Sequence, residues 1–294
     1  MTTEQKQQYK AGTVLLIGRP NAGKSTLLNN LLKTKVSITS PKPQTTRFPI
    51  EAVYEDERGQ IIFTDTPGVF GKARDQLARK INQNAHDAYE SPCDVVLYVI
   101  DKTRSRDYEE NKTLGHVRSI KAPKIVVFNK IDVRRPDYTI QYLFLKDEVE
   151  EVIEISALRH DNLNLLLDAI FKYLPEREAI VDTTNQAFAA INMTSNQFIA
   201  EIIREKVFLF TRKEVPYSIT TTVDEVTERA NGNLYIKGNI LTDSERYKAM
   251  LIGDSGKRIK EMGTAVRKEL EAATGKKVFV DLNVAVDVHW HERF

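Results

Sequence analysis

Short apolar runs alternate with longer amphipathic segments over residues 13–174 of the chain. The runs are rich in valine and isoleucine and carry few polar residues, which is typical of parallel strands buried on both faces. They lie at residues 13–18, 61–66, 95–101, 124–130 and 152–157. Helical patterns separate them, among them residues 24–33 and the leucine-rich segment 161–174. This alternation predicts an α/β domain with a mostly parallel sheet and helices on both faces.

A different order of elements follows a polar stretch at residues 179–195. An amphipathic helical pattern comes first, followed by two strands, a short helix, a longer basic helix and a final strand. Asn231-Gly232 lies between the two strands and is a strong hairpin signal, because both residues tolerate positive φ. The segments cover residues 197–210, 220–226, 233–241, 245–251, 256–274 and 278–288. The order α-β-β-α-α-β predicts a second, smaller α+β domain.

The chain length agrees with this division, since 294 residues are more than one compact domain usually holds. Within the first domain, residues 52–63 predict a β-hairpin, which would give the sheet one antiparallel edge. No apolar run approaches the roughly 18 to 20 residues of a membrane span. The single cysteine, Cys93, excludes an intramolecular disulfide, is expected in the core, and suits a cytoplasmic protein. We expect an N-terminal tail at residues 1–12, a first domain at 13–178, a linker at 179–195 and a second domain at 196–294.

Residues 18–25, with the sequence GRPNAGKS, carry the strongest chemical signal. They fit the pattern G-x-x-x-x-G-K-[ST] directly after a predicted strand and at the start of a predicted helix. The glycines let backbone N–H groups converge on a phosphate, and the helix N-terminus adds partial positive charge. Lys24 would reach the β- and γ-phosphates, and the Ser25 hydroxyl would bind Mg²⁺. The residues expected to contact the nucleotide here are Gly18, Arg19, Pro20, Asn21, Ala22, Gly23, Lys24, Ser25 and Thr26.

Three further motifs end predicted strands, where a nucleotide site on a parallel sheet is expected. They are Asp65-Thr66-Pro67-Gly68, Asn129-Lys130-Ile131-Asp132 and Ser156-Ala157. Asp65 would hold Mg²⁺ through its water ligands, and the Gly68 amide would meet the γ-phosphate. The Asp132 carboxylate can accept from N1–H and the exocyclic amine of guanine, a donor pair that adenine lacks, while a backbone N–H at Ser156-Ala157 can donate to guanine O6. The four motifs in this order predict a GTPase rather than an ATP-using enzyme.

The segment 41–48, PKPQTTRF, lies where the first nucleotide-sensitive loop belongs. A threonine there can give its hydroxyl oxygen to Mg²⁺ only while the γ-phosphate is present; Thr46 is the expected residue and Thr45 the alternative. Val69 follows Gly68, where Ras-like enzymes carry a glutamine that orients the attacking water, so slow intrinsic hydrolysis is expected. One hypothesis is that the Asn21 carbonyl holds K⁺ beside the β- and γ-phosphates. The expected catalytic residues are Lys24, Thr46, Asp65, Gly68 and Asn21, and the expected metal ligands are Ser25, Thr46 and Asp65.

A second glycine loop, Gly253-Asp254-Ser255-Gly256, joins two predicted helices of the second domain. Two glycines at this spacing are common by composition alone, but the element order around them is that of a type II KH domain, whose loop clamps single-stranded RNA. From Arg246 to Lys277 there are nine Lys/Arg and four Asp/Glu, although the whole chain carries a net charge of only +2. We expect Asp254 to face solvent or to cap the following helix. The expected RNA contacts are Ile252, Gly253, Asp254, Ser255, Gly256, Lys257, Arg258 and Lys260.

Together these motifs resemble the Era family of bacterial GTPases, which carry a C-terminal KH domain. The similar stretches cover nearly the whole chain: GRPNAGKSTLLN, PKPQTTR, DTPG, NKID, ISA, EIIREK, PYS and LIGDSGKRIKEMGTAVRKELE. The resemblance implies a switch that uses GTP/GDP and Mg²⁺, binds the 3′ end of small-subunit (16S) ribosomal RNA and assists maturation of the small (30S-type) ribosomal subunit. It also implies a cytoplasmic protein that can associate peripherally with the inner face of the cell membrane, and we expect a monomer. Asp254 departs from the family, whose members usually carry a basic or amide residue there.

One alternative function remains open from the residues. A signalling or membrane-associated GTPase could use its C-terminal module to bind protein or anionic lipid. The two functions differ in how RNA would bind, because binding that is weak, insensitive to salt and independent of nucleotide would favour the alternative.

Overall fold

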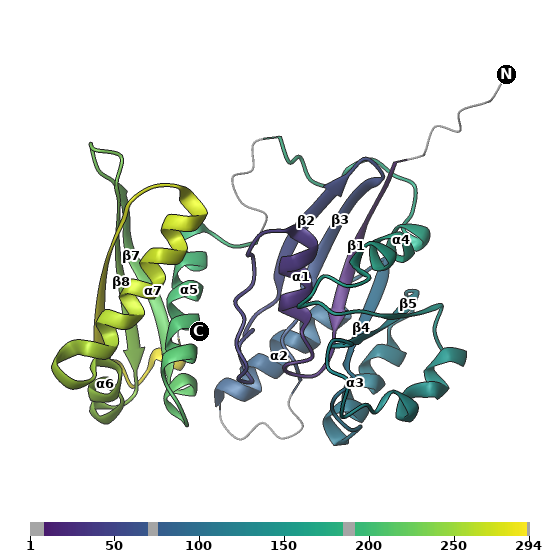
Figure 1. The fold of residues 1–294 in the computed structure, drawn as a ribbon, viewed down its shortest axis with the longest axis horizontal. Coiled ribbons are helices and arrows are strands. Elements are labelled where there is room, and N and C mark those ends of the chain that lie inside the picture. Colours follow the sequence, from purple (N-terminus) through teal and green to yellow (C-terminus); the bar gives the residue numbers. More distant parts are fainter. Residues whose placement is uncertain (1–8, 70–75, 185–191, 293–294) are drawn as a thin grey trace. The chain divides into compact units, whose positions relative to one another are not determined.

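The computed structural model describes residues 9–69, 76–184 and 192–292 (Figure 1). The chain divides into two compact units between Asn192 and Met193. The predicted tail at 1–12 and linker at 179–195 lie partly outside the described residues. Within those residues, no helix combines the length and the apolar character that crossing a bilayer requires.

The first unit is built on a six-stranded sheet in the order β2-β3-β1-β4-β5-β6. Strand β2 is antiparallel to β3, and the described neighbours of the other strands are parallel, so the predicted antiparallel edge is confirmed. Strand β1 begins at Lys10 rather than at Thr13, because Lys10 already pairs with Gly59 of β3. The strands are β1 (Lys10–Ile17), β2 (Ile50–Asp56), β3 (Gly59–Asp65), β4 (Val95–Asp101), β5 (Lys124–Asn129) and β6 (Glu151–Glu154).

Helices cover both faces of this sheet. Successive residues of a strand point to opposite faces, so Leu16 packs in the core beneath α1 and α4, while Ile17 packs in the core beneath α2 and α3. The helices are α1 (Lys24–Leu32), α2 (Gln76–Glu90), α3 (Tyr108–Ser119) and α4 (Leu163–Tyr173), with a 3₁₀ segment at Thr139–Asp147. The predicted three-layer arrangement is confirmed.

Cys93 differs from its prediction, because it is half-buried at the edge of the α2/α3 core rather than inside it. It lines a cavity of about 420 Å³ together with residues of β1, β3 and α2. Burial and the neighbouring Asp94 raise the pKa of the thiol, which favours its protonated form.

The second unit has the predicted element order α-β-β-α-α-β (Figure 1). Its sheet runs β7-β8-β9, with β8 and β9 parallel, and its helices pack into one apolar core. Ile236 and Val278 belong to that core, so their neighbours Tyr235 and Phe279 point to the opposite face of the sheet. The elements are α5 (Ser195–Phe210), β7 (Ile219–Glu228), β8 (Leu234–Thr242), α6 (Glu245–Ile252), α7 (Lys257–Thr274) and β9 (Val278–Val286).

Candidate functional site

The four predicted nucleotide motifs meet at the C-terminal ends of strands β1, β3, β5 and β6. Strand β1 lies between β3 and β4, so the connection after β1 runs to one side of the sheet and the connection after β3 runs back past β1 to the other side. Such a reversal opens a crevice beyond the strand ends, where ligands bind in open α/β sheets. The fold therefore gathers motifs separated by more than a hundred residues into one site.

The phosphate loop is enclosed tightly at its two glycines. A Cβ atom added at Gly18 would lie 2.3 Å from the Val99 carbonyl oxygen, and one added at Gly23 would lie 2.2 Å from Asn129 Nδ2. Gly23 also has φ of 100°, a left-handed conformation that glycine adopts at little cost. It precedes α1 without a side-chain cap, so the first N–H groups of the helix point to where an anion would bind.

The Lys24 ammonium is buried within this loop. Its Nζ donates to the Gly18 carbonyl oxygen at 2.8 Å and to the Arg19 carbonyl oxygen at 3.3 Å. Burial lowers the pKa of Lys24, and the negative charges of Asp65 and Glu110 oppose that effect. A phosphate would supply charged acceptors at the same ammonium, and these are stronger partners than neutral carbonyls.

Three predicted metal ligands lie together beside Lys24. Ser25 Oγ donates to Asp65 Oδ2 at 2.6 Å and lies 3.1 Å from Thr46 Oγ1. Asp65 Oδ1 is buried and has no hydrogen-bond partner among the described residues, and burial raises the pKa of Asp65. Hydroxyl and carboxylate oxygens of this kind fit Mg²⁺. The Thr45 hydroxyl instead donates to the Lys42 carbonyl oxygen at 2.7 Å, so the fold brings Thr46 rather than Thr45 to Ser25.

The guanine-specific motifs are joined to the phosphate loop by Asn129. Its Nδ2 donates to the Ala22 carbonyl oxygen at 2.8 Å, and its Oδ1 accepts from the Ala157 N–H at 2.9 Å. Ser156 Oγ donates to Asp132 Oδ1 at 2.7 Å, which orients the carboxylate expected to bind guanine. The Ser156 N–H donates to the Asp161 carbonyl oxygen at 3.3 Å. The two backbone N–H groups of Ser156-Ala157, one of which was predicted to donate to guanine O6, thus both have acceptors within the protein.

Lys130 binds the phosphate loop directly and is held by Asp101, a residue that was not predicted as part of the site. Its Nζ donates to Asp101 Oδ2 at 2.6 Å and to the Asn21 carbonyl oxygen at 3.0 Å. The Asn21 side chain donates in turn to the Pro41 carbonyl oxygen at 2.9 Å, which links the phosphate loop to the nucleotide-sensitive segment. Asp101 ends β4, and the position of a carboxylate at the end of a buried strand is the signal from which its role in the site could have been predicted.

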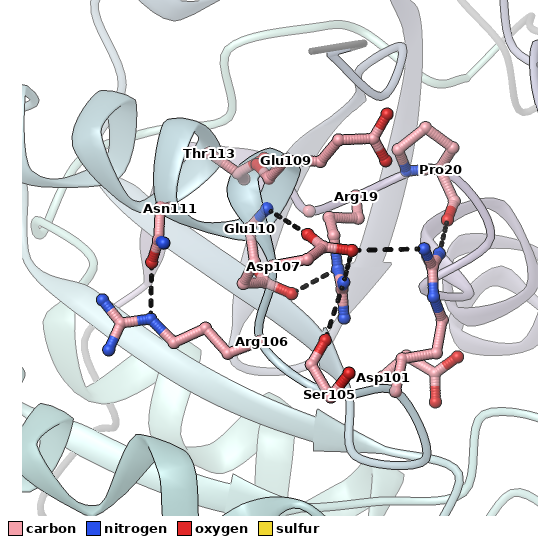
Figure 2. Close-up of polar contacts among 12 residues, drawn as sticks. Arg19, Pro20, Asp101, Ser105, Arg106, Asp107, Glu109, Glu110, Asn111 and Thr113 are labelled. Atoms are coloured by element: carbon pink, nitrogen blue, oxygen red, sulfur yellow. Dashed lines mark hydrogen bonds and ion pairs between the residues drawn. The ribbon is translucent and has the colours of Figure 1, made fainter.

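Arg19 was predicted to contact the nucleotide, but its guanidinium is held elsewhere (Figure 2). The side chain is buried, pairs with Glu110 at 2.5 Å, and donates to Asp107 Oδ2 at 2.8 Å and to the Ser105 carbonyl oxygen at 3.1 Å. Burial raises the pKa of Glu110, and the Arg19 charge opposes that rise. A contact between Arg19 and phosphate therefore has to come from its backbone.

The segment that holds Arg19 also begins helix α3. Asp107 Oδ1 accepts from the Glu110 N–H at 2.9 Å and so caps the helix. Arg104 Nη1 donates to the Pro20 carbonyl oxygen at 3.2 Å. None of these three residues was predicted as part of the site. The Asp107-x-x-Glu110 spacing could have indicated a helix start, but nothing local indicated its pairing with Arg19.

The motif after β3 lies against the phosphate loop. A Cβ atom at Gly68 would be 2.5 Å from the Pro20 nitrogen, so glycine is required for this close approach. Thr66 Oγ1 donates to the Leu16 carbonyl oxygen at 2.7 Å, and the Pro67 carbonyl oxygen accepts from the Tyr89 hydroxyl at 3.4 Å. Val69 is buried in the α2/α3 core, and its aliphatic side chain cannot hydrogen-bond a water molecule.

The tip of the second glycine loop, Asp254 and Ser255, is exposed, whereas the phosphate loop is enclosed. Gly253, Ser255 and Gly256 all have positive φ, at 75°, 47° and 76°. Asp254 is exposed, and α7 begins after Gly256 without a side-chain cap. Solvent exposure of Asp254 is therefore confirmed, and the alternative that it caps α7 is wrong, because Gly256 occupies the capping position.

The predicted RNA-contacting side chains differ in how freely they reach solvent. Lys257 and Lys260 are exposed, whereas Arg258 is partly buried and donates from Nη1 to the Met250 carbonyl oxygen at 2.5 Å. Ile252 and Ile259 are partly buried against the domain core. The loop thus offers two open cations and a partly apolar wall.

A cavity of about 300 Å³ lies between α7 and β9, and its lining begins at Ile259, three residues beyond the loop. Its α7 wall holds the cations Lys260 and Arg267, and Asp281 of β9 is the one carboxylate of its lining. The lining residues are Ile259, Lys260, Gly263, Thr264, Arg267, Phe279, Val280, Asp281 and Leu282. This combination of apolar floor and basic wall suits a single-stranded nucleic acid.

Comparison with known families agrees with both sites. A family model described as 50S ribosome-binding GTPase matches residues 13–130, and a KH-domain model matches residues 214–291. The chain is 38% identical over 294 residues to GTPase Era of Halothermothrix orenii. It is 40% identical over 296 residues to GTPase Era of Aquifex aeolicus. Each alignment covers 97% of this chain and 96% of the relative.

Two solved structures extend the similarity to the fold. A variant of Aquifex aeolicus Era bound to GDP and AlF4⁻ is 39% identical, with a TM-score of 0.86. Era in complex with MgGDPNP and nucleotides 1506–1542 of 16S ribosomal RNA is 38% identical, with a TM-score of 0.88. Both comparisons cover 97% of this chain and 96% of the neighbour.

These similarities confirm the predicted fold class, a P-loop GTPase domain followed by a KH domain. They also support the predicted ligands GTP or GDP and Mg²⁺, since the neighbours hold these or their analogues. The chain therefore belongs to the Era family of GTPases, whose nucleotide-hydrolysing domain is joined to a C-terminal KH domain.

Proposed function

We propose that this GTPase binds the 3′ end of small-subunit ribosomal RNA through its KH domain and assists maturation of the small ribosomal subunit. The observation that carries the proposal is the loop Gly253–Gly256 with its exposed tip, followed by the exposed cations Lys257 and Lys260 and a cavity along α7 and β9. The Era structure that contains 16S ribosomal RNA supports the same partner for a chain of this similarity.

The nucleotide site would act as the control for this binding. Ser25 and Thr46 would give hydroxyl oxygens to Mg²⁺, with Asp65 beside them; when bound, the metal neutralises charge on the β- and γ-phosphates. Thr46 lies on a segment tied to the phosphate loop through Asn21 and Pro41, so loss of the γ-phosphate would release that segment. Hydrolysis of GTP would thereby change the conformation of this segment.

A filter-binding titration of the full chain with an RNA of the 16S 3′ end tests the proposal. We expect binding that weakens as salt rises and that differs between a GTP analogue and GDP, with a scrambled RNA as control. Binding that is weak, insensitive to salt and equal in both nucleotide states would overturn it. Anionic vesicles in a parallel titration would then test the alternative membrane-associated function.

The hydrolysis step carries a second part of the proposal. With Val69 in place of a water-orienting residue, we propose slow intrinsic hydrolysis and stimulation by K⁺ held at the Asn21 carbonyl. The test compares turnover in K⁺ and Na⁺ at equal ionic strength. Equal rates in the two salts would remove K⁺ from the mechanism.

We further propose that the protein is a cytoplasmic monomer with peripheral contact to the inner face of the cell membrane.

A further inference from the structure

An aromatic pair lies on the face of the KH sheet that the helices leave uncovered. Tyr235 of β8 pairs directly with Phe279 of β9, and their rings are 5.8 Å apart with an interplanar angle of 16°. Phe279 is 59% exposed. The two rings are therefore stacked with nearly parallel planes, and the Phe279 ring remains largely open to solvent.

Arg229 lies closer to the Tyr235 ring than to the Phe279 ring. Its guanidinium carbon is 4.8 Å from the Tyr235 ring centroid and 5.9 Å from that of Phe279. Tyr235 is correspondingly half-buried, while the Phe279 ring keeps most of its area. Cross-strand pairing of the two aromatics stabilises a sheet by roughly 0.2–1 kcal/mol. That role explains their contact with each other and leaves the open Phe279 ring face without a function.

The open ring belongs to the groove that follows α7 from Ile259, three residues after the glycine loop. Phe279 lines the cavity between α7 and β9, whose wall also includes Lys260 and Arg267. Arg267 lies eleven residues beyond Gly256, or about 16 Å along the helix axis. The N–H of Val278 donates to Glu271 Oε1 at 3.2 Å, which fixes the start of β9 beside the end of α7. Phe279 is thus at the far end of the groove from the loop.

The charges around the ring favour a strand of RNA over an apolar peptide. The exposed cations near the aromatic pair are Arg229, Arg267 and Lys277, and each could bind a phosphate. The one carboxylate of the cavity lining, Asp281, accepts from the Tyr235 hydroxyl at 3.3 Å. Aromatic side chains and arginine planes bind unpaired bases by stacking, at roughly 1–3 kcal/mol per base.

We propose that Phe279, supported by Tyr235 and Arg229, is a stacking site for one unpaired base of the bound RNA. A KH loop clamps the backbone of about four nucleotides. The stacked base would lie beyond that tetranucleotide, at the end of the groove away from Gly253–Gly256. The inference rests on the proposed RNA-binding function and adds to it a second contact, which lengthens the bound segment.

The test measures binding of two RNAs to the full chain and its variants at fixed salt. One RNA is a tetranucleotide that fills only the loop-proximal groove, and the other is a dodecanucleotide of the 16S 3′ end. Phe279→Ala and Phe279→Leu should weaken the longer RNA by roughly 5- to 100-fold and leave the tetranucleotide unchanged. Phe279→Tyr keeps an aromatic ring and should bind both RNAs as the unaltered chain does.

Abasic substitutions scanned along the longer RNA identify the base. At one position, removing the base should cost as much as Phe279→Leu, and combining the two should cost no more than either alone. Equal losses for both RNAs, or leucine binding as well as tyrosine, would overturn the stacking site while leaving the proposed function intact. If the unaltered chain bound neither RNA, the proposed function itself would fail.

Discussion

The glycines that precede α1 in the phosphate loop and α7 in the KH loop use the same local device in opposite surroundings. Helices α1 and α7 both begin after a left-handed glycine and lack a side-chain cap. A Cβ atom at Gly23 would collide with Asn129, whereas one at Gly256 would meet no atom within 4 Å. Lys24 is buried beside the first loop, and Lys257 is exposed beside the second.

This difference separates two ways of holding a phosphate. In an enclosed loop a few donors act in a low-dielectric pocket, so each contact is strong and its loss is costly. In an open loop the contacts with an RNA backbone are solvated and screened by salt, so affinity comes from the sum of many weak terms. Substitutions in the two loops should therefore differ in the size of their effects.

The largest effect is expected for Gly23→Ala. The added Cβ would lie 2.2 Å from Asn129 Nδ2 at a residue with φ of 100°, so the loop has to move away from the guanine-binding motif. We expect GDP affinity to fall by about 100-fold or more, roughly 3 kcal/mol, in a fluorescent-nucleotide titration. Gly115→Ala is the matched control, because its Cβ meets nothing within 4 Å and lies inside α3. Unchanged GDP affinity for Gly23→Ala would contradict the description of an enclosed loop.

A smaller effect is expected for Gly256→Ala in the open loop. The position has φ of 76° and free space around its Cβ, so only the conformational cost of roughly 1–2 kcal/mol applies. RNA affinity in a filter-binding titration should fall by no more than about 30-fold. Gly275→Ala carries the same kind of cost at φ of 68°, at the other end of α7, and should leave RNA affinity unchanged. A loss as large as that of Gly23→Ala would remove the distinction between the two loops.

A change of charge at the KH loop is expected to alter RNA affinity less than Gly256→Ala does. Asp254→Lys replaces an exposed carboxylate by a cation, so RNA should bind about two- to fivefold more tightly at low salt, with a steeper salt dependence. Asp254→Asn serves as the control and should give a smaller gain. Thermal stability should not change, because Asp254 caps no helix. Equal RNA affinities for aspartate and lysine would mean that charge at this position has no part in binding.

Acid should lower the stability of the nucleotide-binding unit in part through His116. The His116 ring lies 4.6 Å from that of His86 and also contacts Tyr89, between α2 and α3. Burial, His86 and Lys112 lower the pKa of His116 below 6.5, so the folded state binds this proton less readily than the unfolded chain. Stability is therefore retained at neutral pH and lost as pH falls through about 6.5.

The expected decrease is a degree or two in the Tm of the nucleotide-binding unit between about pH 7.5 and 5.5. Differential scanning calorimetry of the full chain measures it. His116→Gln removes the titrating ring and should flatten this part of the pH profile. A profile identical to that of the unaltered chain would assign the acid sensitivity to other groups.

Much of the fold and the site could be predicted because its signals are local. The β-branched runs ending at Asp65, Asp101 and Asn129 indicate buried strands, and ligands bind beyond the ends of such strands. The Asn231-Gly232 turn predicts the β7–β8 hairpin, whose closing bond runs from the Arg229 N–H to the Asn233 carbonyl oxygen at 2.9 Å. Each of these patterns depends on backbone preferences within a few residues.

Other predictions failed or stayed open because they depended on side-chain directions. Sequence spacing left Thr45 and Thr46 as alternatives, and the path of the loop brings the Thr46 hydroxyl to Ser25. Asp254 was compatible with capping α7 or with solvent exposure, and a left-handed Gly256 took the capping position. In each case neighbouring residues of similar chemistry differed only in where the backbone aimed them.

The sequence by itself determined the order of elements, the four GTP motifs and the glycine loop of the KH domain, since these rest on local spacing. Only the tertiary structure decided which distant groups meet. It paired Arg19 with Asp107 and Glu110, committed the Ala157 N–H to Asn129, and set Phe279 beside Tyr235. Such contacts depend on strand register and helix packing, which place residues far apart in the chain within a few ångströms of each other.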